Sequence, residues 1–138
     1  MRAVDLVGGT EILAEQDCWD LLQTAEIGRV AVCFGGQVDI FPVNFGLDGD
    51  GIVFRTNAGR KMNALSTSEV AFEVDQVDLR ARAGWSVVVH GDARDISNFD
   101  GPERRRAARP WTGSKDFLIR ITPRSISGRR VVPTSDDF

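Results

Sequence analysis

The stretch RVAVCFGGQVDIFPVNF, residues 29–45, decides the fold class of this chain of 138 residues. Two runs rich in β-branched and aromatic residues, 29–34 and 37–45, flank the pair Gly35-Gly36. Two β-prone runs joined by a two-residue glycine loop are typical of a tight β-hairpin. Pro42 has no backbone N–H group, so we expect it at a sheet edge or a bulge. The stretch therefore predicts antiparallel β-structure.

The rest of the chain repeats this pattern. Further runs typical of strands are IVFRT (52–56), VAFEVDQV (70–77), GWSVVVHGDARDI (84–96) and DFLIRITP (116–123). Short helices are expected at 17–24 and within 57–68, and 102–110 reads as a cationic helix or loop. The runs show no β-α-β alternation, which argues against a parallel dinucleotide-binding fold. The sequence predicts a mainly β, α+β fold: a six- to seven-stranded antiparallel barrel with a few short helices.

Length and charge limit the possible partners. The chain fits one domain spanning 1–138, with an N-terminal arm at 1–9 and a partly ordered tail at 128–138. Its 20 acidic and 17 basic side chains give a net charge of −3, which provides no general attraction for nucleic acid or an anionic membrane. No run approaches the roughly 18 apolar residues of a membrane span. We therefore expect a cytoplasmic protein that binds neither partner.

Few residues are available for metal binding. The two cysteines, Cys18 and Cys33, and the single histidine, His90, fall short of the roughly four ligands of a structural zinc site. We expect no metal site and two buried cysteines. His90 could donate a proton near a ligand, but its place between Val89 and Gly91 on a strand favours a position in the core.

The segment FRTNAGRKMNAL, residues 54–65, carries the strongest functional signal. It places Arg55 and Thr56 at a strand end and the basic pair Arg60-Lys61 after Gly59, where a short helix is expected. A terminal phosphate is bound by arginine forks, a lysine and backbone N–H groups, and this segment supplies all of them. From the residues alone, a solvated basic turn remains an equal alternative.

This segment resembles the flavin-phosphate segment of the pyridoxamine 5′-phosphate oxidase-like split-barrel family. Three other stretches are similar to that family in the same order: GRVAV (28–32), PVNF (42–45) and GWSVVVHG (84–91). Together the four stretches cover roughly residues 17–127. The resemblance implies a split β-barrel that binds flavin mononucleotide (FMN), or alternatively a deazaflavin, and forms a homodimer with the cofactors at the subunit seam.

The resemblance also assigns roles to individual residues. It implies that the cofactor phosphate is held by Arg55, Thr56, Arg60 and Lys61. It implies that the flavin ring lies along Pro42, Val43 and Asn44. Ser86 stands where the oxidases have a glutamine directed at the flavin, and Trp85 beside it either stacks on a ligand or belongs to the core.

The C-terminal part departs from the oxidase pattern. Where the oxidases have a Glu-Phe-Trp segment and a substrate-binding Arg-Leu-His run, this chain has SISGRRVVP (125–133). Its pair Arg129-Arg130 could reach a second anionic group or belong to the tail. The departure argues against pyridoxamine phosphate oxidation. It leaves a flavin- or deazaflavin-dependent oxidoreductase acting on a small acceptor, similar to nitroimidazole-resistance reductases.

Two other functions compete with this interpretation. A non-catalytic carrier of flavin, haem or a similar ligand would use the same site without turnover. A nucleic-acid module would use RRRAAR (104–109) for phosphate contacts, but the acidic net charge and the lack of an exposed aromatic series argue against it.

Overall fold

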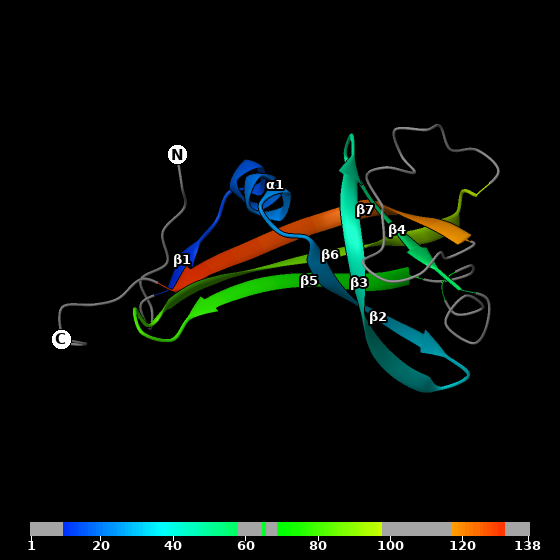
Figure 1. Cartoon of the computed structure of the whole chain (residues 1–138), viewed down its shortest axis with the longest axis horizontal. Helices are drawn as coiled ribbons and strands as arrows, with labels where there is room; N and C mark the ends of the chain where they lie inside the picture. The colour runs from blue at the N-terminus through cyan, green and yellow to red at the C-terminus, as the bar shows by residue number, and fades with distance from the viewer. Residues whose placement is uncertain (1–9, 58–64, 66–68, 98–116, 132–138) are drawn as a thin grey trace.

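The structure, a computed structural model, describes residues 10–57, 65, 69–97 and 117–131. One helix and seven strands lie in this part of the chain (Figure 1). In chain order they are β1 (Thr10–Ile12), α1 (Glu15–Gln23), β2 (Ile27–Phe34), β3 (Gln37–Asp48), β4 (Gly51–Thr56), β5 (Glu69–Asp78), β6 (Ala83–Asp95) and β7 (Phe117–Val131). The predicted antiparallel split barrel is confirmed. Further helical turns were expected within 57–68 and 102–110, and of these segments residues 58–64, 66–68 and 102–110 lie outside the described residues.

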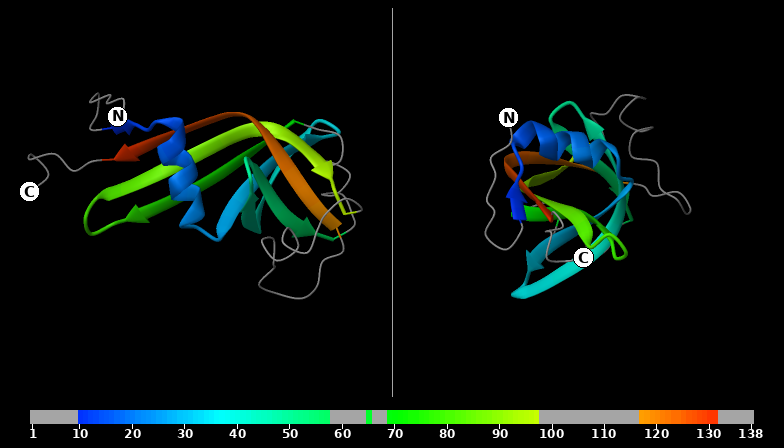
Figure 2. Two further views of the ribbon diagram at one scale, coloured as in Figure 1. Left: turned by 90° about the horizontal axis from the view of Figure 1, so that it is seen from above. Right: turned by 90° about the vertical axis from the view of Figure 1, so that its left-hand side faces the viewer.

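Six strands close into a ring in the order β7-β4-β3-β2-β5-β6, and β6 pairs with β7 to complete it. All pairings are antiparallel, and β1 adds to the outer edge of β7 near its C-terminal end. The long strands β5, β6 and β7 extend beyond the ring, and α1 crosses this extension (Figure 2). The described residues include no helix long and apolar enough to cross a membrane.

The hairpin predicted from residues 29–45 is present as β2 and β3. Phe34 pairs with Gln37 across Gly35 and Gly36, whose φ angles are +59° and +77°. Positive φ at both central residues is the geometry of a type I′ turn, which glycine adopts without steric cost. Pro42 pairs with Arg29 of β2, while β4 pairs with β3 from Phe45 onward. Among the described strands, none pairs with the other edge of Pro42, so the predicted edge position is confirmed.

The core forms where alternate residues of the strands point into the ring. Fully buried side chains include Val30, Phe72, Val89 and Ile121, from four different strands. Phe45 and Phe72 meet edge to face, with ring centroids 5.0 Å apart and ring planes at 74°. Each such large apolar side chain contributes about 2 kcal/mol by leaving water. Helix α1 adds Cys18 and Leu22 to the same core.

The residues between these core positions point away from the ring. We call the resulting surface of β2, β3, β5, β6 and β7 the outer face; it includes Arg29, Ile40, Pro42, Glu73, Asp75, Ser86, Val88 and Arg129. Val38 and Ile40 on this face are each 67% exposed. Since α1 packs on the opposite, core-facing side, this broad surface has no cover among the described residues.

Three features differ from the sequence-based expectation. His90 is exposed, because Val87 and Val89 occupy the inward positions of β6 and alternation turns His90 outward. Cys33 is also exposed, because it lies near the turn of the β2–β3 hairpin. Residues 128–131, expected to begin the tail, are the last residues of β7 and pair with β6 and β1.

Candidate functional site

The barrel is split where β3 changes partner. Residues up to Asn44 pair with β2, and from Phe45 onward β3 pairs with β4. The last pair of the β3–β4 ladder is Phe45 with Phe54, so Asn44 and Arg55 are the next residues beyond it on their two strands. Phe45 also donates its N–H group to the carbonyl oxygen of Glu26 at 3.0 Å. The pairing of β3 with β4 therefore ends beside Arg55, and we call this break in the sheet the opening.

Arg55 and Thr56 end β4 at this opening, with side chains on opposite faces. Arg55 is half-buried, and no carboxylate among the described residues forms an ion pair with it. Thr56 is buried, and its hydroxyl donates to the carbonyl oxygen of Asn57 at 3.5 Å, which is long for a hydrogen bond. Arg60 and Lys61, the other two residues assigned to the phosphate, lie outside the described residues.

The segment expected to line the flavin ring runs along the neighbouring strand. Pro42 is exposed and Asn44 is half-buried on the outer face, while Val43 points inward and is buried. Their partners on β2 are Arg29 for Pro42, Gly28 for Val43 and Ile27 for Asn44. A ligand on the outer face would therefore meet the side chains of Pro42 and Asn44 and the backbone at Val43.

Trp85 and Ser86 lie at the other end of the molecule. β7 links the two places, because Phe117 pairs with Thr56 and Arg129 pairs with Ser86. Twelve residues separate Phe117 from Arg129, which corresponds to about 40 Å of strand. Trp85 was expected either to stack on a ligand or to belong to the core, and it packs against the core. One chain therefore does not bring Trp85 and Ser86 together with Arg55 and Thr56.

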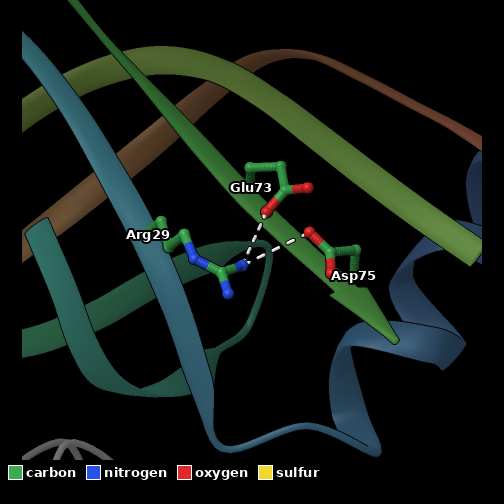
Figure 3. A network of polar contacts seen from close by, with 3 residues as sticks. All are labelled: Arg29, Glu73 and Asp75. Atoms are coloured by element: carbon green, nitrogen blue, oxygen red, sulfur yellow. Dashed lines mark hydrogen bonds and ion pairs between the residues drawn. The ribbon is translucent and has the colours of Figure 1, made fainter. Parts of the chain in front are cut away.

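A polar network that the motifs did not indicate occupies the middle of the outer face (Figure 3). Nη1 of Arg29 on β2 donates to Oε1 of Glu73 at 3.2 Å and to Oδ2 of Asp75 at 3.3 Å, both on β5. The side chains are 53%, 34% and 35% exposed, respectively. One guanidinium nitrogen thus holds two carboxylates that stand two residues apart on one strand.

Glu73 binds its proton unusually tightly. Burial against the sheet raises the pKa of its carboxyl, and a hydrogen bond and charge repulsion from Asp75 raise it further, to about 7. The Arg29 guanidinium acts in the opposite direction and lowers this pKa. The carboxylate pair therefore changes its proton count near neutral pH.

Two hollows adjoin this network. One, of about 520 Å³, is lined by the end of α1, the start of β2 and the side chains of Arg29 and Asp75. The other, of about 580 Å³, is lined by Glu73, Asp75, Ser86 and Arg129 with the β5–β6 turn. Both volumes fall in the range of small-molecule sites. Asp75 lines both hollows, so the two hollows adjoin at Asp75.

A sequence profile of the family described as Pyridoxamine 5′-phosphate oxidase matches residues 14–130, which include nearly all described strands. The chain belongs to this family. The family resemblance of the four sequence stretches is thereby confirmed.

Individual relatives of this oxidase family agree in sequence and fold. The chain is 31% identical to the uncharacterized protein Rv0080 of Mycobacterium tuberculosis over 131 residues, 89% of this chain and 86% of the relative. A putative pyridoxamine 5′-phosphate oxidase from Corynebacterium glutamicum is 33% identical, with a TM-score of 0.74 over 90% of this chain and 99% of that one. The FAD binding protein from Mycobacterium smegmatis is 32% identical, with a TM-score of 0.69 over 88% and 97% of the two chains.

The raised pKa of Glu73 predicts how stability depends on pH. Between about pH 4.5 and 7 the folded state binds more protons than the unfolded state, so the free energy of unfolding falls as pH rises through this window. The variant Glu73→Gln should lose this dependence. Because the Glu73 side chain is one-third exposed, we discount its contribution to about 1 kcal/mol, or about 3 °C in Tm.

Thermal unfolding at several pH values, followed by circular dichroism, measures this difference. Between pH 5 and pH 8 the Tm of the wild type should fall by about 3 °C more than that of Glu73→Gln. Parallel curves for the two proteins would show that Glu73 titrates normally. Glu69→Gln is a useful control, because hydrogen bonding to Arg124 lowers the pKa of Glu69, so its contribution to stability is lost only below about pH 4.5 and this variant should keep the wild-type slope between pH 5 and pH 8.

Proposed function

We propose that this chain binds a flavin at the opening beside Arg55 and uses it as an oxidoreductase. The phosphate end is held by Arg55, Thr56, Arg60 and Lys61, and the ring lies along Pro42, Val43 and Asn44. We propose FMN as the cofactor, because its terminal phosphate suits this basic cluster, and a deazaflavin is the alternative. The FAD binding protein from Mycobacterium smegmatis, at 32% identity, supports a flavin as the class of cofactor.

The observation that carries the proposal is the state of Arg55. It lies at the end of β4, at the point where the pairing of β3 with β4 ends, with no carboxylate partner among the described residues. A half-buried guanidinium that no described carboxylate compensates becomes more favourable when an anion is present, because the anion replaces the lost hydration. A phosphate fits this position, since it accepts several charge-assisted hydrogen bonds.

The outer face offers a surface for a planar ring, and apart from the Glu73–Asp75 pair the described residues supply few groups for acid–base chemistry there. A bound flavin supplies hydride and electron transfer itself, so the protein has to bind it, orient it and tune it by hydrogen bonds. The exposed side chain of Pro42 and the half-buried amide of Asn44 offer a flat edge and polar groups for this task. The chain contains no tyrosine, and its single histidine is exposed on β6.

The complete site is proposed to form between two copies of the chain. Trp85 and Ser86 lie about 40 Å of strand away from Arg55 in one chain, so a second copy is proposed to bring such residues to the phosphate end of the site. The outer face offers the surface for this contact, since Val38 and Ile40 are each 67% exposed there. Exposed apolar side chains of this kind are typical of protein interfaces.

The proposal is tested with freshly purified protein. We expect absorption bands in the flavin region, release of FMN or a deazaflavin on denaturation as identified by mass, and sedimentation at twice the mass of one chain. Steady-state assays with NADH, NADPH or a reduced deazaflavin and a small acceptor then separate an oxidoreductase from a non-catalytic carrier, which binds without turnover. Colourless protein that fails to bind FMN, FAD and deazaflavin at micromolar concentration would end the proposal.

A further inference from the structure

Arg29 lies between the proposed ring segment and a carboxylate pair. In the register of the sheet, Pro42 of β3 is opposite Arg29 of β2, and Arg29 is opposite Glu73 of β5. Directly opposed residues in antiparallel strands have Cα atoms about 5 Å apart. A group lying over Pro42 is therefore within reach of a long side chain at position 29.

The guanidinium of Arg29 has N–H groups that no described residue accepts from. Both bonds to Glu73 and Asp75 come from Nη1, and within the described part of the chain Nε and Nη2 have no acceptor. The side chain is 53% exposed, so it can turn without disturbing the core. Since the two carboxylates are bound through one nitrogen at 3.2 and 3.3 Å, they hold Arg29 loosely compared with a two-nitrogen fork.

We propose that Arg29 is a further cofactor-binding residue, which turns from Glu73 and Asp75 to an electron-rich edge of the ligand over Pro42, and that the carboxylate pair takes up a proton as Arg29 leaves. This inference rests on the proposed flavin function. Flavin rings carry carbonyl oxygens and ring nitrogens along one edge, and these are acceptors that an arginine satisfies.

The direction of the proton movement follows from the charges. Arg29 lowers the pKa of Glu73, whereas Asp75 and burial raise it, so withdrawing Arg29 or covering the pair raises it further from about 7. The proton comes from solvent, and no bond other than O–H forms. Four other charged or titratable groups lie near the pair. Glu26 lines the hollow beside Arg29, and Arg82 and Arg129 line the hollow beside Ser86. His90 lies on β6, two residues from Val88, which is opposite Glu73.

The test counts protons during binding of FMN to the apoprotein. Titration calorimetry at pH 7 in two buffers of different ionisation enthalpy gives the number of protons exchanged. We expect the wild type to take up about half a proton more per FMN than Glu73→Gln, because Glu73 starts near half protonation. The comparison cancels the proton that the FMN phosphate itself exchanges, since that contribution is the same in both proteins.

Arg29→Met should weaken FMN binding about tenfold, the loss of one charge-assisted hydrogen bond, and should also abolish the extra proton uptake. The matched control is Arg124→Met, because Arg124 also bridges two carboxylates, Glu69 at 2.8 Å and Asp92 at 3.5 Å, away from Pro42. This control should bind FMN and protons like the wild type.

The outcomes separate this inference from the proposed function. FMN binding with equal proton uptake in wild type and Glu73→Gln would overturn the role of the carboxylate pair and leave the flavin site intact. Unchanged affinity in Arg29→Met would overturn the role of Arg29. Failure of the wild type to bind any flavin would remove both the function and the inference that rests on it.

Discussion

Replacing Arg60 and Lys61 together by glutamine is expected to raise the Kd for FMN by 100-fold or more, to about 10⁴-fold at the upper end. Each residue supplies a charge-assisted hydrogen bond to the phosphate, worth about 1.5–3 kcal/mol, so the pair accounts for about 3–6 kcal/mol. Both residues lie outside the described part of the chain, and their role rests on the FRTNAGRKMNAL segment and on Arg55, which the structure places at the barrel opening. Fluorescence quenching of FMN by the apoprotein measures the effect.

Single and control variants make this result specific. Arg60→Gln and Lys61→Gln should each weaken binding about tenfold or more. Arg80→Gln removes the same charge from an exposed position in the β5–β6 turn and should leave the Kd within about twofold of the wild type, because exposed charges far from a site are screened. Equal losses in all three variants would mean that net charge, and not a phosphate site, controls binding.

The variant Gly91→Ala is expected to destabilise the fold by about 3 kcal/mol. Gly91 lies where β6 and β7 shift register, between the pairs His90–Ser125 and Gly91–Pro123. A Cβ atom there would lie 2.4 Å from the carbonyl oxygen of Thr122 and 3.0 Å from its carbonyl carbon. Both atoms belong to the backbone of β7, so the clash is relieved only if the two strands move apart.

Urea unfolding checks this expectation: the variant should unfold at a lower urea midpoint than the wild type, with the same dependence of the free energy of unfolding on urea concentration. The matched control is Gly35→Asn in the β2–β3 turn. Its site has no atom within 4 Å of the added Cβ, and asparagine tolerates the positive φ of +59°. The control should change stability by less than about 1 kcal/mol. A Gly91→Ala midpoint equal to that of the control would show that the register shift tolerates a side chain.

Much of the fold could be predicted because its local signals agree. The glycine pair at 35–36 and the alternation of Phe72 and Val74 with polar neighbours identify strands without any tertiary information. β1 was not predicted, because its three residues, Thr10–Ile12, carry no periodicity and are fixed by pairing with β7. His90 was placed inside because its neighbours are apolar, although strict alternation along β6 turns it outward.

The candidate site was predictable in its residue types and less so in their arrangement. The FRTNAGRKMNAL segment is local, so Arg55 and Thr56 could be assigned to a strand end before the structure was known. The Arg29 network could not be found in this way. Alternation indicates that Glu73 and Asp75 share a face, but it does not indicate that β2 pairs with β5, whose opposed residues Arg29 and Glu73 stand 44 positions apart in the sequence.

The position of β7 in the ring also bears on how the protein is made. β7 pairs with β4, β6 and β1, so the hydrogen-bond ladders of these three earlier strands are incomplete until residues 117–131 have been made. On a translating ribosome, the hairpin of β2 and β3 can form early, whereas β4 and β6 keep unsatisfied edges until these residues emerge from the exit tunnel. The nascent chain is therefore most prone to aggregation until β7 has left the exit tunnel, and slow translation of this region would lengthen that exposure.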